Sequence, residues 1–287
     1  MTTMTPERTS ASPPERTGPL RRVLSEGTVL VSFGVSIASV LFAFIVPLTI
    51  GPDALRVDPS RRFAAPAANA LLGTDHLGRD LVAMIALGLR TSIVIALLVV
   101  VASSAVGWAT GALSGYLGGA IDNVLSRVMD VFNAFPGLIL AIALVTVLGP
   151  SFSTIVVVLI LVTWVNYARV IRARVLSLKR SDYVVASRMY GTSTPRLLLR
   201  HVWPNTLDLM LSVSLVQIPN VMLAESTISF LGFGLQPPEV SLGLLISSEK
   251  DYLQTHALPV LVSGGVLVLV CAAFATAGLR IRRRWQA

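Results

Sequence analysis

The chain has 287 residues, of which 54% are hydrophobic and 13% charged, and its mean hydropathy is +0.75. Soluble domains carry about 25% charged residues, so this composition excludes an ordinary soluble protein and indicates a membrane protein. The formal charge of +8 is expected from the basic loops of such proteins and does not point to nucleic acid. The single cysteine, Cys271, excludes an internal disulfide.

The N-terminal part of the chain divides into a tail, a first span and a connecting segment. Residues 1–22 are rich in Thr, Ser, Pro, Glu and Arg, which predicts a disordered cytoplasmic tail. Residues 23–50 are predicted to form the first transmembrane helix, because 27–47 carries no charge and is long enough to cross a bilayer. Residues 51–90 are then expected to lie outside the cytoplasm.

The core of the protein is predicted to comprise residues 91–280 and to contain five further spans. Charge-free runs indicate these spans at 91–116, 131–168, 209–224 and 257–279. The run 131–168 is long enough for two helices, and Gly149-Pro150-Ser151 interrupts it, which predicts a tight hairpin of two spans. The sequence therefore predicts an all-α membrane protein with six transmembrane helices. A basic cytoplasmic tail, 281–287, follows, and the arginines within 280–284 are expected to contact anionic lipid.

The distribution of positive charge predicts how the chain is oriented. If the N-terminus lies in the cytoplasm, 17 of the 23 Lys and Arg residues lie on the cytoplasmic side and 6 on the other side. Because cytoplasmic loops carry an excess of Lys and Arg, both termini are predicted to be cytoplasmic. The same orientation puts the basic loop 169–208 in the cytoplasm.

The stretch 181–205 is the longest polar interruption of the apolar sequence and predicts two short helices around a glycine. Ser181 is expected to cap the first helix, with Asp182 in its first turn, where the helix dipole favours a carboxylate. Gly191 is expected to end that helix in a conformation with positive φ. Thr194 is expected to cap the second helix, which a proline then begins.

The same stretch resembles a known family motif, the coupling loop of ABC-importer membrane subunits. That motif reads Glu-Ala-Ala, three residues, Gly, nine residues, Ile-x-Leu-Pro, and here the matching spacing is Ala186-Ser187, three residues, Gly191, nine residues, His201-Val202-Trp203-Pro204. The flanking sequences, DYVVASR and LRHVWPN, are similar to the dipeptide, oligopeptide and nickel branch of the family. This chain departs from the motif at Val185, which replaces Glu, at Ser187, which replaces Ala, and at Trp203, which replaces Leu.

Two further stretches, each beside a predicted span, resemble segments of the same branch. Residues 72–80 read LGTDHLGRD, and residues 224–238 read AESTISFLGFGLQPP. Two roles remain open for them: ordinary loop packing, or docking of a binding protein on the outer face.

The resemblance implies the transmembrane domain of a type I ABC importer and a set of partner proteins. These partners are a second homologous permease, two ATPase subunits that bind MgATP, and an extracytoplasmic peptide-binding protein. It also implies that the following residues couple the chain to the ATPases: Asp182, Tyr183, Ala186, Ser187, Arg188, Gly191, His201, Pro204 and Asn205. Di- or oligopeptides are the cargo expected from the branch, with nickel and glutathione as alternatives.

The chain itself is expected to be non-catalytic and to hold no cofactor. A Walker A sequence is missing, because Lys179 and Lys250 are the only lysines and neither follows a glycine. The three histidines lie far apart in the sequence without the spacing of metal ligands, so no metal site is expected.

Three polar residues in and beside the fifth predicted span are candidates for the transport pathway. Gln217 and Asn220 lie within 209–224, and Glu225 follows it. Polar groups in hydrocarbon need partners or must line water, so Gln217 and Asn220 are expected either to line the pathway or to bond neighbouring helices. Glu225 is expected to mark the membrane interface, with contact to a peptide amine as the alternative.

Two other classes of protein are weaker interpretations of this sequence. An ion-coupled secondary transporter would need ionisable residues at mid-membrane, and the six apolar runs contain none. A membrane-tethered DNA-binding protein would account for the basic helix–glycine–helix pattern of 169–204, but a helix-turn-helix needs a third helix and its own core. Nucleic acid is therefore not expected as a partner.

Overall fold

The computed structural model describes residues 19–50, 55–68 and 70–286. The predicted disorder of residues 1–18 lies outside the described residues, whereas 19–22 already belong to the first helix. The described part is helical apart from its loops, and two isolated bridges are its only β pairings. The predicted all-α fold is therefore confirmed.

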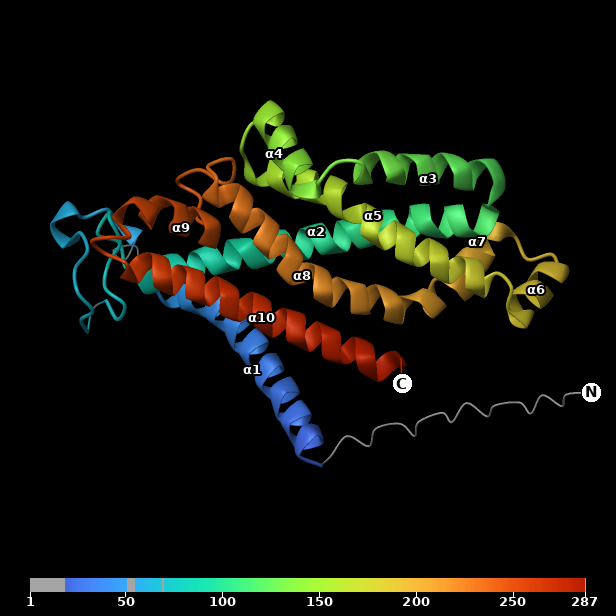
Figure 1. Cartoon of the computed structure of the whole chain (residues 1–287), viewed down its shortest axis with the longest axis horizontal. Coiled ribbons are helices and arrows are strands. Elements are labelled where there is room, and N and C mark those ends of the chain that lie inside the picture. Colours follow the sequence, from blue (N-terminus) through green and yellow to red (C-terminus); the bar gives the residue numbers. More distant parts are fainter. Residues whose placement is uncertain (1–18, 51–54, 69, 287) are drawn as a thin grey trace, which may run out of the picture.

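Within the described residues, ten α-helices follow one another. They are α1 (Pro19–Thr49), α2 (Leu81–Leu117), α3 (Gly119–Asn133), α4 (Gly137–Leu148), α5 (Phe152–Leu178), α6 (Asp182–Met189), α7 (Thr194–Leu197), α8 (Leu207–Phe230), α9 (Leu242–Glu249) and α10 (Leu258–Gln286). Short 3₁₀ turns lie at Pro59–Arg61, Pro204–Thr206 and Lys250–Tyr252, and Leu198–Val202 is π-helical. Figure 1 shows α2, α5, α8 and α10 running along the molecule, with 55–80 and α9 at one extremity and α6 and α7 at the other. These extremities are called the α9 end and the α6 end below.

In the part of the chain that the structure describes, five helical segments are long and apolar enough to cross a membrane. They are Leu30–Thr49, Leu81–Leu117, Phe152–Leu178, Pro204–Phe230 and Leu258–Leu279. The predicted third span differs, because α3 and α4 meet at an angle of 83° and count as a sixth span only when taken together. Pro136 lies in this bend; proline lacks a backbone donor and disfavours helical geometry at the preceding residue. The part of the charge-free run before Gly149 is therefore not one uninterrupted helix.

Several predicted helix boundaries also differ from the structure. Helix α2 begins at Leu81 rather than at residue 91, because Asp80 caps it by accepting a hydrogen bond from the Ala83 backbone and Arg90 lies within the helix. Helix α8 continues to Phe230, beyond the predicted end at 224. Helix α10 continues to Gln286, so the predicted tail after residue 280 is largely helical.

The hairpin predicted between α4 and α5 is confirmed. Gly149 ends α4 with φ +84°, a conformation that residues with a Cβ rarely adopt. Ser151 then caps α5, and its hydroxyl accepts a hydrogen bond of 3.1 Å from the Thr154 backbone. These local signals suffice to reverse the chain because both residues favour the turn over continued helix.

Helices α2 and α5 pack with their backbones in close contact through three glycines spaced four residues apart. A Cβ on Gly107 would stand 2.7 Å from the Trp164 carbonyl oxygen, and one on Gly115 would stand 2.9 Å from the Arg172 carbonyl oxygen. A Cβ on Gly111 would collide with the Ala168 carbonyl. Small residues at this spacing let transmembrane helices approach closely, where van der Waals contacts and weak hydrogen bonds accumulate.

Replacing the central glycine of this contact is expected to destabilise the protein. Gly111→Ala must push α2 and α5 apart, and overpacking of this kind costs about 1–3 kcal/mol. We expect a lower midpoint of thermal unfolding for the detergent-solubilised chain, measured by size-exclusion chromatography after heating. Gly265→Ala in α10 is the matched control, because a Cβ there would meet no atom within 4 Å. Equal midpoints for the two variants would show that the glycines are not required for this contact.

Candidate functional site

The stretch that resembles the coupling motif forms a separate helical projection at the α6 end. Helix α6 ends with Tyr190 at its C-cap and Gly191 beyond it at φ +75°. The Gly191 backbone N–H donates to the Arg188 carbonyl at 3.0 Å, and that of Thr192 donates to the Ser187 carbonyl at 3.2 Å. This pair of bonds is the Schellman arrangement, so the predicted helix end at Gly191 is confirmed.

The two predicted caps of this stretch are not formed as expected. Ser181 stands at the N-cap of α6, but its hydroxyl donates to the Leu178 carbonyl at 2.6 Å and makes no capping bond. Helix α7 includes Thr194, and Ser193 occupies its N-cap. The second helix is also shorter than predicted, since it passes into the π-helical segment Leu198–Val202. A capping hydroxyl has other acceptors within reach, and the sequence does not say which one it selects.

A cluster of buried apolar side chains fastens this projection to α2 and α5, and it is called the coupling-loop core. Its members come from α2, α5, the projection and α8, and are Ala112, Tyr116, Ile171, Val175, Val184, Leu197, Leu198, Val202 and Met210. Val184 is the buried residue of α6, with 2% of its surface exposed. The core therefore ties the short α6 to the two helices that are joined by the glycine contact.

Trp203, which replaces a leucine of the motif, extends the coupling-loop core. Its ring meets that of Trp108 in an edge-to-face contact with the centroids 4.7 Å apart. The indole N–H of Trp108 donates to the Thr206 hydroxyl at 3.1 Å. Aromatic pairs of this geometry contribute about 0.5–1.5 kcal/mol beyond the area that they bury. Trp108 on α2 thus packs against Trp203, the residue that stands where the motif has leucine.

The residues predicted to couple to an ATPase lie mostly at the surface of the projection. Those that the structure leaves exposed are Asp182, Tyr183, Ala186, Arg188, Gly191, Pro204 and Asn205. Ser187 and His201 are half-buried, and their side chains approach to 3.4 Å between Oγ and Nε2. Asn205 donates from Nδ2 to the His201 carbonyl at 2.7 Å. The motif residues therefore divide into an outward surface and a pair that joins α6 to the segment after it.

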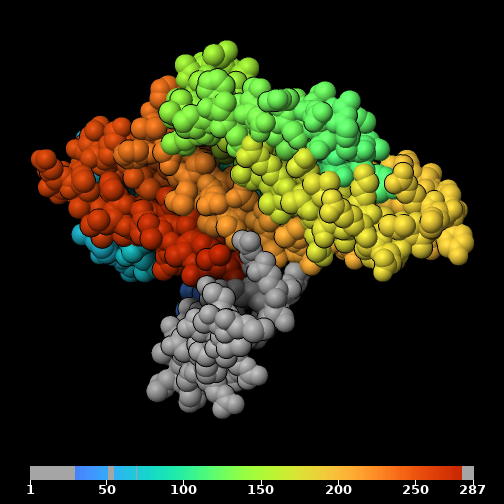
Figure 2. All heavy atoms as spheres, turned by 45° about the vertical axis from the view of Figure 1, so that its right-hand side comes forward, coloured from blue at the N-terminus to red at the C-terminus, as the bar shows by residue number. Residues whose placement is uncertain are grey.

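Two apolar side chains at the tip of α6 are almost fully exposed. Met189 is 85% exposed and Tyr190 is 90% exposed. Figure 2 shows this part of the chain, drawn in yellow and amber, projecting at one extremity of the molecule. Large apolar side chains presented together on a projection are typical of a surface that binds a partner protein.

The contact of α6 with the coupling-loop core can be tested with substitutions at a buried and at an exposed residue of this helix, Val184 and Val185. Val184→Asp would place a charge in the coupling-loop core and is expected to detach α6, because an unpaired buried charge costs several kcal/mol. Trypsin should then cleave at Arg180, Arg188, Arg196 or Arg200 at least about tenfold faster in detergent. Val185→Asp is the control, since Val185 is 43% exposed. Equal cleavage rates of both variants would contradict the role of the core.

A cavity between α4, α5 and α8 brings together polar side chains, among them two of the three candidate pathway residues. It has a volume of about 190 Å³, and its polar lining consists of Thr163, Asn166, Gln217 and Asn220. The Asn220 Nδ2 donates to Gln217 Oε1 at 3.0 Å. Asn166, on α5, lines the same cavity. The sequence analysis did not predict this residue as a candidate, because nothing in the sequence places it opposite α8.

Glu225 is not at the end of its helix and does not line this cavity. Glu225 belongs to α8 and its side chain is fully buried. The carboxylate accepts hydrogen bonds from Ser92 at 2.9 Å and from Ser229 at 2.8 Å. Ser226 donates a longer bond of 3.4 Å. Glu225 thus joins α8 to α2 through Ser92, a partner 133 residues earlier in the sequence, and its position at the membrane interface stays a prediction.

Residues 72–80, the first stretch that resembles the family outside the loop, form a turn at the α9 end. Asp75 is fully buried and accepts hydrogen bonds from the backbone of Leu77 and Arg79, both at 2.9 Å. The Arg79 guanidinium adds two contacts of 2.7 Å to the second carboxylate oxygen. This arrangement holds the turn before α2. In the second stretch, residues 224–230 are part of α8 rather than of a loop.

Two histidines at the α9 end, His76 and His256, contact side chains that are distant in the sequence. His76 Nδ1 lies 2.6 Å from Glu249 Oε1, although the two residues are 173 positions apart. The His256 ring stacks on Phe63 with the centroids 4.0 Å apart. The prediction of no metal site considered only the spacing between histidines, so it could not include this pairing of a histidine with a distant carboxylate.

The membrane-length helices, together with the helical projection at the α6 end, define a multi-pass membrane protein. The chain belongs to the family described as binding-protein-dependent transport system inner membrane component, which matches residues 107–285. The predicted resemblance to ABC-importer permeases, and the type I fold that it implies, are confirmed.

Relatives of the chain include permeases of peptide transport systems. It is 29% identical to the dipeptide transport system permease protein DppC of Alkalihalophilus pseudofirmus, covering 97% of this chain and 94% of that protein. It is 34% identical to the DppC protein of Haemophilus influenzae over 74% of this chain and 72% of that protein. It is 29% identical to the oligopeptide transport system permease protein OppC of Bacillus subtilis over 91% and 86%.

Proposed function

We propose that this chain is the permease subunit of an ATP-driven importer that carries di- or oligopeptides across the cytoplasmic membrane. The observation that carries the proposal is the exposed tip of α6, held on a projection whose sequence spacing matches the family's coupling motif. The names of the relatives, which are dipeptide and oligopeptide permeases, support peptides as the cargo.

The proposed complex contains a second homologous permease, two ATPase subunits and an extracytoplasmic peptide-binding protein. MgATP is bound by the ATPases, so this chain performs no catalysis and carries no cofactor. The α6 end and both termini face the cytoplasm; this orientation is supported by the 17 of 23 Lys and Arg residues that it places there. The binding protein then delivers its peptide at the α9 end.

Transport in this proposal is alternating access by movement of packed helices. ATP binding draws the two ATPases together, and with them the projections of the two permeases. The coupling-loop core passes this displacement to α2, α5 and α8, because it joins side chains of all three helices. The pathway opens to the outside when the projections close and to the cytoplasm after hydrolysis, as in transporters that rock around a central site.

The cavity beside α8 is proposed to form this chain's part of the peptide pathway. Its lining offers amide groups, each with both donors and acceptors, and no charged side chain among the lining residues. Peptide bonds present the same pair of groups in every peptide. A neutral amide lining therefore binds the backbone of the cargo without selecting a side-chain charge, which suits a carrier of varied short peptides.

The docking role of α6 is tested by removing its most exposed aromatic side chain. Tyr190→Ala is expected to weaken binding of the ATPase subunits roughly 30-fold, equivalent to about 2 kcal/mol for an aromatic anchor. The measurement is binding of purified ATPase to inside-out membrane vesicles that contain the permeases. Leu253→Ala is the control, because Leu253 is an exposed apolar residue at the opposite end. Unchanged affinity would remove Tyr190 from the interface, and binding to right-side-out vesicles would reverse the orientation.

The pathway role is tested by replacing the amides with apolar side chains of similar size. Gln217→Leu with Asn220→Leu removes the bonding groups of α8 and is expected to lower peptide uptake about tenfold, the equivalent of one to two lost hydrogen bonds. Uptake of a labelled dipeptide by proteoliposomes containing the whole complex is the measurement. Leu223→Ala changes the same helix outside the cavity lining and serves as the control. Full uptake by the double variant, with ATPase binding intact, would contradict this pathway.

A further inference from the structure

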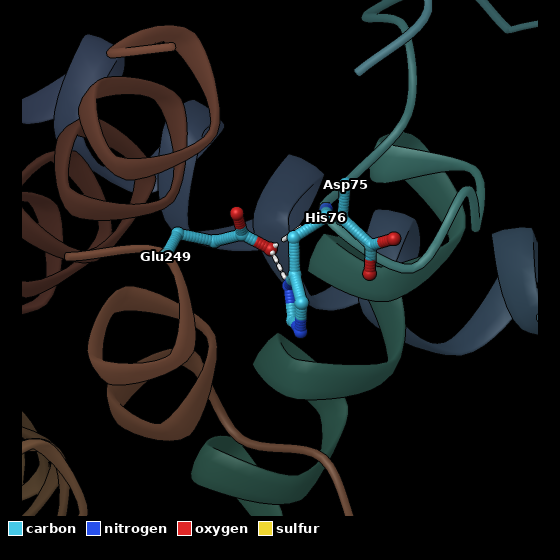
Figure 3. A group of neighbouring side chains, drawn as sticks. All are labelled: Asp75, His76 and Glu249. Carbon is cyan, nitrogen blue, oxygen red and sulfur yellow. Dashed lines mark hydrogen bonds and ion pairs between the residues drawn. The ribbon is translucent and has the colours of Figure 1, made fainter. Parts of the chain in front are cut away.

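Three potential metal ligands meet at the α9 end. Asp75 and His76 belong to the turn before α2, and Glu249 ends α9. One ligand atom from each residue lies within 4.8 Å of the other two. Figure 3 shows the Glu249 side chain extending from its helix toward His76, with Asp75 on the adjoining backbone. The group therefore joins two segments that are distant in the sequence.

The carboxylate of Glu249 is buried with half of its bonding capacity unused. Only 1% of the residue is exposed, and Oε1 receives the contacts from the His76 ring at 2.6 Å and the His76 backbone at 3.3 Å. Within the described part of the chain, Oε2 has no hydrogen-bond partner. Buried polar groups are almost always bonded, and an orphaned carboxylate oxygen calls for an explanation such as an ion.

Within the described residues, the negative charge of the Glu249 carboxylate is paired with His76 and with no Lys or Arg. Arg79 neutralises Asp75 through contacts of 2.7 Å. The neighbouring lysine, Lys250, lies over the Phe230 ring, with its Nζ 5.5 Å from the ring centroid. A cation bound between His76 and Glu249 would balance this charge and occupy the orphaned oxygen.

We propose that His76 and Glu249 bind a divalent transition-metal ion of the Zn²⁺ type, with Asp75 as the third donor. One imidazole and two carboxylates form a donor set that suits such ions better than Mg²⁺, which prefers oxygen ligands alone. Ligand atoms at about 2.0–2.2 Å from a tetrahedral Zn²⁺ lie about 3.3–3.6 Å apart, so atoms that now lie within 4.8 Å of one another must move by up to about 1.5 Å to surround the ion. On binding, the ion replaces any proton shared between His76 Nδ1 and Glu249 Oε1, and that proton passes to solvent.

The ion would fasten the end of α9 to the turn that precedes α2. His76 is 19% exposed at its side chain, which gives the ion a route from solvent, whereas Asp75 and Glu249 are buried beneath it. A bound ion stabilises the folded chain because it has little affinity for separated ligands. This role is structural and does not depend on which solute the transporter carries.

The test uses the full-length chain, purified with a tag free of histidine and stripped of metal with a chelator. Zn²⁺ is expected to bind with a stoichiometry of one per chain and to raise the midpoint of thermal unfolding by about 3 °C or more. Mg²⁺ at the same concentration is expected to leave the midpoint unchanged. Metal content is measured by mass spectrometry of the eluted protein and the midpoint by differential scanning fluorimetry.

Two variants assign the ion to this group, and a third controls for other histidines. His76→Gln and Glu249→Gln are each expected to lose the bound Zn²⁺ and its stabilising effect. His256→Gln should keep both, because His256 stacks on Phe63 at the same end but is not a member of the group. A wild-type chain that neither retains nor responds to Zn²⁺ overturns the proposal, even if the variants fail to fold. Undiminished binding by either folded ligand variant overturns it as well.

Discussion

The close contact of α2 with α5 is the constraint on which the rest of the structure depends. In a membrane, helices do not associate by withdrawing apolar surface from water, so contact area and backbone proximity must supply the attraction. Gly107, Gly111 and Gly115 provide that proximity, since each places the α2 backbone against carbonyl groups of α5. Helices α1 and α8 pack against α2, and α10 packs mainly against α8 and α1. The α2–α5 pair contributes much of the buried core.

The helical projection at the α6 end is held in position by the same pair of helices. Its core includes Ala112 and Tyr116 from α2 and Ile171 and Val175 from α5, alongside the glycine contact. Helix α6 has eight residues, too few to be stable alone in water. Its geometry is therefore set by what it packs on. So short a helix keeps its position and its exposed surface because α2 and α5 hold its base.

The features that could be predicted from the sequence were those determined by residues close to one another in the chain. The turn at Gly149, the helix end at Gly191 and the apolar spans all depend on local conformational preference or local hydrophobicity. Several of the features that were missed depend on distant partners. The bonds from Ser92 to Glu225 and from His76 to Glu249, and the contact of Trp203 with Trp108, join residues far apart in the chain. The bend at Pro136 was missed because an uninterrupted charge-free run concealed it.

The length of α2 has a mechanical consequence. Its 37 residues span about 55 Å at 1.5 Å per residue, well beyond the roughly 30 Å of a hydrocarbon layer. One continuous rod, without an internal proline, thus runs from the capped turn at Asp80 to the tryptophan pair at Trp108 and onward to Tyr116. A continuous helix of this kind tilts as a whole when one of its ends is displaced. A displacement at either end therefore moves the other end, because no hinge lies between them.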